Sequence, residues 1–98
     1  MSSHSYISNS KNKNIYININ GELLHRDKAK ISVFDSGFLL GDGVWEGIRL
    51  HKNSLIFIKD HLNRLFDSAK GISLKIPFSK DEIIDEINKV LSKNNMSD

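Results

Sequence analysis

The alternation of hydrophobic and polar residues predicts β-strands in the first part of the chain. Residues 15–19 alternate, the dipeptide Asn20-Gly21 follows, and residues 22–24 form a second short run. Asn-Gly between two such runs is typical of a type I′ turn, so an antiparallel hairpin is expected. A further short strand is expected at residues 31–34, leading into a glycine-rich segment.

A second hairpin and two helices are expected further along the chain. Residues 44–51, which alternate, and residues 55–58, which are apolar, are expected to form its strands on either side of the turn residues 52–54. Beyond them, hydrophobic residues at helical spacing predict a helix that Asp60 caps and Gly71 stops. Its apolar positions are Leu62, Leu65, Phe66 and Ala69.

A capping-box pattern at Ser79 and Glu82 predicts the start of the last helix, which is expected to end near Asn94. Its apolar stripe consists of Ile83, Ile84, Ile87, Val90 and Leu91. Two hairpins followed by two helices indicate an α+β fold, in which the helices pack on a largely antiparallel sheet.

Composition narrows the class of protein. Of the 98 residues, 1–14 form a polar tail that is expected to be disordered, and 15–98 form one domain with twelve basic and twelve acidic residues. Without a basic stripe, nucleic acid is not an expected partner. The absence of cysteine and the scattered histidines predict neither disulfide nor metal site. No apolar run reaches the roughly 18 residues of a membrane span, so a cytoplasmic protein is expected.

Four glycines lie within residues 37–49, which indicates a backbone that turns sharply or is approached closely. Gly41 and Gly43 are interpreted as a tight turn with positive φ angles. A phosphate cradle is the weaker interpretation, because the longer spacing of a dinucleotide or P-loop motif is missing.

Alternation along residues 44–51 places Trp45 and Gly47 on one face and Glu46 on the other. A glycine beside an aromatic side chain leaves a gap in which a small ligand could lie. The structural alternative is a bulge at Gly47 with Trp45 in the core. Glu46 is expected to be half-buried and paired.

The chain has eleven lysines and three arginines, one of which is Arg64. Positions that need only a positive charge are therefore mostly lysine, so an arginine indicates a need for its planar, forked guanidinium. The alternative is a solvated or salt-bridged residue in the middle of a helix. His61 is expected to be a surface residue or to contact a residue that itself binds a ligand. Arg26 and Arg49 have no comparable support.

The run GFLLGDGVWEGIR at residues 37–49 and the run HLNRL at residues 61–65 resemble the N-terminal small domain of the class IV (fold type IV) pyridoxal-phosphate aminotransferases. That family contains branched-chain and D-amino-acid aminotransferases and aminodeoxychorismate lyase. The resemblance implies pyridoxal 5'-phosphate as cofactor, an amino acid and a 2-oxo acid as substrates, and a homodimer. GDGV occurs in both aminotransferase types, whereas EGIR favours the branched-chain type.

The resemblance also implies roles for individual residues. Arg64, in the H-x-x-R-L motif, corresponds to the arginine that binds the cofactor phosphate. Trp45 and Gly47 correspond to residues that line the substrate pocket, with Phe38 and Leu40 nearby. Many branched-chain enzymes have a tyrosine at the position of Leu40, so a phenolic hydroxyl is missing from this wall.

In the family, the Schiff-base lysine and the acid near the pyridine nitrogen lie in a second, C-terminal domain. None of the eleven lysines here is flanked like a buried amine, so no catalytic residue is assigned. The resemblance therefore implies an N-terminal fragment that is inactive alone. The alternatives are a D-amino-acid aminotransferase or aminodeoxychorismate lyase of the same family, or a non-catalytic interaction domain with the same small-domain fold.

Overall fold

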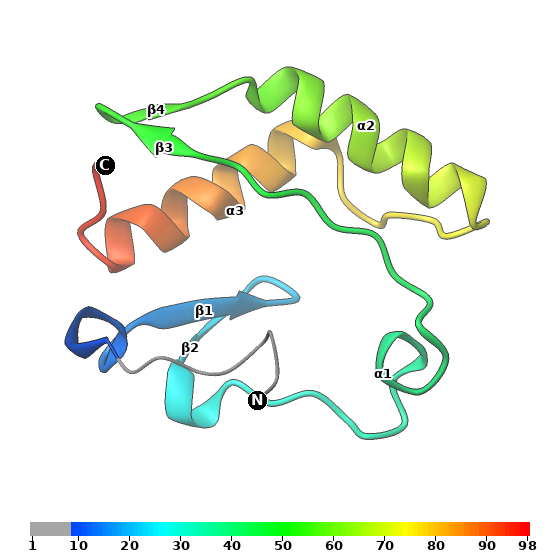
Figure 1. Ribbon diagram of the computed structural model, residues 1–98, viewed down its shortest axis with the longest axis horizontal. Coiled ribbons are helices and arrows are strands. Elements are labelled where there is room, and N and C mark those ends of the chain that lie inside the picture. Colours follow the sequence, from blue (N-terminus) through cyan, green and yellow to red (C-terminus); the bar gives the residue numbers. More distant parts are fainter. Residues whose placement is uncertain (1–8) are drawn as a thin grey trace, which may run out of the picture.

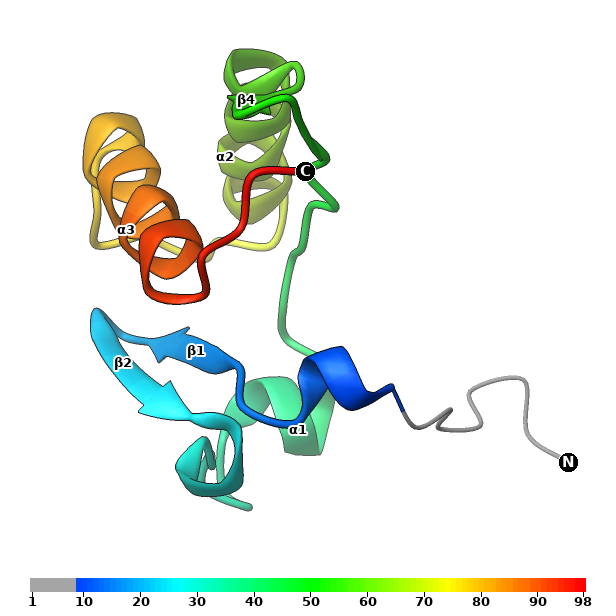
Figure 2. The same ribbon diagram turned by 90° about the vertical axis from the view of Figure 1, so that its left-hand side faces the viewer.

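The computed structural model describes residues 9–98, which form an α+β arrangement of helices and antiparallel strands (Figure 1). A hairpin of β1 (Tyr16–Ile19) and β2 (Glu22–His25) lies below helix α3 (Lys80–Lys93). Helix α2 (Ile58–Gly71) lies beside α3 on the other side, as the second view also shows (Figure 2). The predicted fold class is confirmed.

The N-terminal hairpin forms where the sequence predicts it. Ile19 pairs with Glu22, and the two residues between them have positive φ angles of 55° at Asn20 and 90° at Gly21. Both residues of a type I′ turn require this conformation, which Asn and Gly tolerate best. The Asn18 side chain accepts a hydrogen bond from the backbone N–H of Gly21 at 2.8 Å, which tightens the turn.

The second hairpin is confirmed in position, but its predicted length is wrong. It consists of β3 (Leu50–His51) and β4 (Ser54–Leu55), joined by Lys52 and Asn53 at φ angles of 47° and 64°. Residues 44–49, predicted as part of the first strand, belong to no strand. The two hairpins form two separate two-stranded sheets within residues 9–98, where one sheet was expected.

The strand predicted at residues 31–34 is also wrong, because this segment lies exposed and joins no sheet. A strand needs a neighbour to satisfy its backbone, and the described residues offer none here. The chain instead continues into a short helix α1 (Ser36–Leu40), whose N-cap Asp35 accepts a hydrogen bond from the N–H of Gly37 at 2.9 Å. A 3-10 turn (Arg26–Lys28) follows β2.

Helix α2 begins two residues before the predicted cap. Its N-cap is Phe57, in the left-handed conformation at φ 54° and without a side-chain hydrogen bond, so the prediction that Asp60 caps the helix is wrong. Asp60 lies in the first turn, where its charge favours the helix dipole. Leu62 and Ala69, 1% and 2% exposed, are the buried hydrophobic residues of the described chain, so its small core lies on this helix.

Helix α3 has the predicted capping box, with Ser79 and Glu82 bonded reciprocally. At its other end, the side-chain amide of Asn94 accepts from the N–H of Tyr16 at 2.7 Å and donates to the Tyr16 carbonyl at 2.9 Å. A side-chain amide thus replaces a neighbouring strand at the edge of β1. None of the helices in residues 9–98 has the length and apolar character needed to cross a membrane.

The predicted disordered tail, residues 1–14, lies largely outside the described part of the chain. Of its described residues, Ser10–Asn12 form a single 3-10 turn capped by Asn9. The Asn12 carbonyl accepts a hydrogen bond from Arg26 at 2.8 Å. The division into tail and domain stays a prediction.

The 98-residue chain by itself is expected to aggregate readily and to melt without a sharp transition. Thirteen large hydrophobic residues of the described part are exposed, whereas its buried hydrophobic residues are Leu62 and Ala69. Isolated two-stranded hairpins are also marginally stable. Calorimetry combined with sedimentation tests this expectation. A cooperative melting transition from a monomer would contradict it.

Candidate functional site

The glycine-rich segment begins where α1 ends. Gly41 terminates α1 in the left-handed conformation, at φ 73°, and its N–H bonds the carbonyl of Gly37. A residue with a Cβ is strained in this conformation, which explains a glycine here. Gly43, for which the same was predicted, has no positive φ angle, so that expectation is wrong.

Side chains along the next residues alternate in exposure as the sequence predicts, although no strand pairs with them. Half-buried positions are Val44, Glu46 and Ile48, and exposed positions are Trp45, Gly47 and Arg49. Trp45 is 83% exposed, so it does not belong to the core. A Cβ added at Gly47 would lie 3.4 Å from Cζ3 of Trp45, so the indole ring lies directly beside the glycine.

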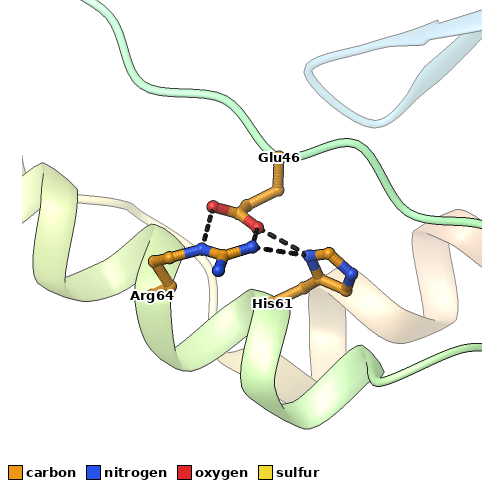
Figure 3. Close-up of polar contacts among 3 residues, drawn as sticks. All are labelled: Glu46, His61 and Arg64. Atoms are coloured by element: carbon orange, nitrogen blue, oxygen red, sulfur yellow. Dashed lines mark hydrogen bonds and ion pairs between the residues drawn. The ribbon is translucent and has the colours of Figure 1, made fainter.

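On the opposite face, the carboxylate of Glu46 binds two side chains of α2 (Figure 3). Arg64 donates from Nε to Oε2 at 2.9 Å and from Nη2 to Oε1 at 2.6 Å. His61 Nδ1 lies 2.6 Å from Oε1. Because an ionised carboxylate only accepts hydrogen bonds, His61 Nδ1 carries the proton that it shares with Glu46. We call Glu46, His61 and Arg64 the carboxylate cluster.

Burial differs sharply within the carboxylate cluster. The side chain of Glu46 is 10% exposed and that of His61 18%, whereas that of Arg64 is 66% exposed. Hydrogen bonds from Arg64 and His61 lower the pKa of Glu46 from 4.5 to about 2, with the bond from Arg64 as the largest cause. The same carboxylate raises the pKa of Arg64, so both groups are charged at neutral pH.

Arg64 keeps donors for a ligand. A guanidinium has five N–H bonds, and Glu46 takes the one at Nε and one at Nη2. Within the described residues, no hydrogen bond involves Nη1. His61 Nδ1 lies 3.2 Å from Nη2, but its proton points to the carboxylate, so it is not an acceptor for the arginine. The exposed edge of Arg64 can therefore bind an anion.

The remaining candidates lie elsewhere. Phe38 and Leu40 are exposed residues of α1, which lies at the far end of the extended segment from α2 in both views (Figures 1 and 2). Trp45 and Gly47 lie together, on the face of the segment opposite to Glu46. The structure thus brings Arg64 into contact with Glu46 and His61. It does not bring Arg64 together with the candidates for the substrate wall, which are Phe38, Leu40, Trp45 and Gly47.

Sequence reasoning predicted a paired Glu46 but did not identify its partners. Two signals could have done so. His61 and Arg64 are three residues apart on one helix and hence on the same face. Glu46 lies between Val44 and Ile48 on the face that turns toward the packed interior. What was missing was the knowledge that this face meets α2.

Comparison with known proteins shows which family the chain belongs to. The family model described as "Amino-transferase class IV" matches residues 43–98, which include the whole carboxylate cluster. A putative branched-chain-amino-acid aminotransferase of Methanocaldococcus jannaschii is 45% identical over 82 residues, and a D-alanine aminotransferase of Listeria monocytogenes is 35% identical over 79 residues. These matches cover 84% and 81% of this chain.

A solved structure is similar to this chain in fold and sequence. The crystal structure of a branched-chain aminotransferase from Thermoproteus uzoniensis with norvaline superposes with a TM-score of 0.78 at 28% identity, covering 87% of this chain and 30% of that one. The chain therefore belongs to the class IV aminotransferase family. It spans 28% of the length of the M. jannaschii relative and 27% of that of the L. monocytogenes relative.

Replacing Arg64 by alanine is expected to raise the pKa of Glu46 from about 2 toward 4.5, because the largest cause of the shift is removed. The folded pKa is the lower one, so the bond stabilises the fold above about pH 4.5 and is lost as the pH falls toward 2. In the intact protein, the carboxyl ¹³C shift of Glu46 should stay constant as the pH falls through 4.5, and in Arg64→Ala it should titrate at a higher pH than in the unsubstituted protein, with the bond from His61 still lowering the pKa.

Glu86 is the matched control. Its pKa is lowered by a hydrogen bond from Lys89, on a different helix from Arg64, so the Arg64 substitution should leave it unchanged. Titration of Glu46 near its ordinary pKa in the unsubstituted protein would mean that the bond to Arg64 does not form in solution.

Proposed function

We propose that this chain belongs to a pyridoxal-phosphate-dependent aminotransferase that transfers an amino group between an amino acid, with branched-chain substrates favoured, and a 2-oxo acid. The observation that carries the proposal is the exposed edge of Arg64, held by a buried carboxylate within the segment that matches the family. The names of the M. jannaschii relative and the T. uzoniensis structure support the branched-chain assignment. D-alanine aminotransferases at 35% identity support a D-amino-acid enzyme as the second candidate.

The chemistry of Arg64 fits a cofactor phosphate. The phosphate of pyridoxal 5'-phosphate is a dianion that matches the forked N–H groups of a guanidinium. Arg64 has unused N–H groups and 66% of its side chain exposed. When bound, the cofactor supplies the electron sink for amino transfer. The proposed role of Arg64 is to anchor the phosphate and so to hold the ring in one position.

Trp45, Gly47, Phe38 and Leu40 are proposed to form one wall of the substrate pocket. The indole of Trp45 beside Gly47 offers an apolar surface with no side chain in the way, which suits an aliphatic substrate. All four residues are exposed in this chain, so the pocket needs further protein to close it. The proposed sources are a C-terminal domain of the same protein and the second subunit of a homodimer. A cytoplasmic location of the protein is part of the same proposal.

Arg64→Ala in the intact protein, as its gene encodes it, is expected to weaken binding of pyridoxal 5'-phosphate roughly 10- to 100-fold, since charge-assisted hydrogen bonds are lost. Binding of pyridoxal, which has no phosphate, should be unchanged. Spectrophotometric titration measures both dissociation constants. Lys70→Ala, an exposed cation on the same helix, is the matched control. An unchanged dissociation constant for pyridoxal 5'-phosphate in Arg64→Ala would contradict the proposal.

The 98-residue chain alone is expected to have no transaminase activity. All eleven lysines are exposed, and an amine needs burial or a nearby positive charge to reach the lowered pKa that the reaction requires. Lys89 has the opposite shift, because the hydrogen bond that it donates to Glu86 raises its pKa. A coupled assay with branched-chain or D-amino acids, 2-oxoglutarate and added cofactor tests this. Turnover above a protein-free control would refute it.

A further inference from the structure

We infer that Glu46 is a positioning residue: it fixes the orientation of the Arg64 guanidinium and thereby determines how well the site distinguishes a phosphorylated cofactor from its unphosphorylated form. This inference rests on the proposed function of Arg64. It assigns the shape of the binding edge to a residue that does not itself contact the ligand.

The hydrogen-bond geometry supports this role. Glu46 binds Arg64 side-on, through two parallel bonds at 2.9 Å and 2.6 Å, which fixes the plane of the guanidinium. The opposite edge, with Nη1, then points in one direction only. An arginine that is 66% exposed and lacks such a partner samples many rotamers and must lose that freedom when it binds an anion.

Glu46 is itself held in place, so it can act as a fixed reference for Arg64. Its side chain is 10% exposed, and it belongs to the half-buried face of the segment with Val44 and Ile48. His61 Nδ1 donates a third hydrogen bond to the carboxylate, at 2.6 Å. Figure 3 shows the carboxylate approaching from the extended segment, with both partners rising from α2. The arrangement therefore couples the segment to the helix.

The negative charge of Glu46 has an opposing effect that makes the inference testable. A carboxylate bonded to Arg64 offsets its positive charge and weakens its long-range attraction for a phosphate. If charge dominated, Glu46→Gln would tighten cofactor binding. If orientation dominates, the same substitution weakens binding, because a neutral amide accepts only one good bond and leaves the fork free to turn. Glu46 bonds Nε and Nη2, so its charge lies on the far side of the guanidinium from a phosphate at Nη1, and the repulsion falls with that distance. Orientation is therefore expected to dominate.

The experiment compares pyridoxal 5'-phosphate and pyridoxal as ligands of the intact protein, with Glu46→Gln, Arg64→Ala and the control Glu86→Gln. Glu86 is a carboxylate with 29% of its side chain exposed that binds Asn18 and Lys89, away from Arg64. Glu46→Gln is expected to raise the dissociation constant of pyridoxal 5'-phosphate about 10-fold, the size of one charge-assisted bond, and to change that of pyridoxal less than two-fold. Glu86→Gln should change neither dissociation constant. The Nε–H resonance of Arg64 should lose its protection from exchange in Glu46→Gln.

Three results would overturn the inference. They are tighter or unchanged binding of pyridoxal 5'-phosphate in Glu46→Gln, equal weakening of both ligands, which indicates a purely structural role, and an unchanged Arg64 resonance. If Glu46→Gln does not fold, His61→Gln removes only the third bond and should give a smaller loss confined to the phosphorylated ligand. Equal loss of both ligands would again overturn the inference. Failure of the proposed function is distinct, because Arg64→Ala would then keep its preference for the phosphorylated ligand.

Discussion

The carboxylate of Glu46 is the interaction on which the candidate site depends. It joins an extended segment that belongs to no sheet to a helix that begins a dozen residues later, and it accepts three short hydrogen bonds in doing so. Because the segment lacks strand partners, its position relative to α2 depends on such side-chain bonds and on its half-buried face. The guanidinium that results is charged, oriented and open on one edge.

Side chains perform a similar task elsewhere in the fold. Asn94 satisfies the backbone of Tyr16 on the edge of β1, and Asn18 on β1 donates to Glu86 of α3 at 2.8 Å. These polar contacts hold the first hairpin against α3 where no further strand is present among residues 9–98. The apolar contribution is small, since Leu62 and Ala69 are the buried hydrophobic residues. The chain thus relies on polar links to a degree that a larger core would not require.

One part of the candidate site could be predicted from the sequence, and the other part could not. Arg64 could be singled out from its motif, and a paired Glu46 from the alternation of its segment. Trp45 and Gly47 could be placed on one face for the same reason, and they do lie together. The position of Phe38 and Leu40 could not be derived, since they belong to α1, a helix that was not predicted and that lies at the far end of the extended segment from α2.

Local chemistry in the sequence determined the elements that rest on near neighbours. The Asn20-Gly21 turn and the Ser79–Glu82 capping box arise from interactions within a few residues, and both form as predicted. Only the tertiary structure decided three other features. They are the start of α2 at Ile58, the absence of a strand at residues 44–49 and the separation of the two hairpins into two sheets. Each depends on which backbone groups find partners far along the chain. The bond between Glu46 and Arg64 belongs to this second group, because a residue's type shows that it needs a partner, and only the fold supplies one.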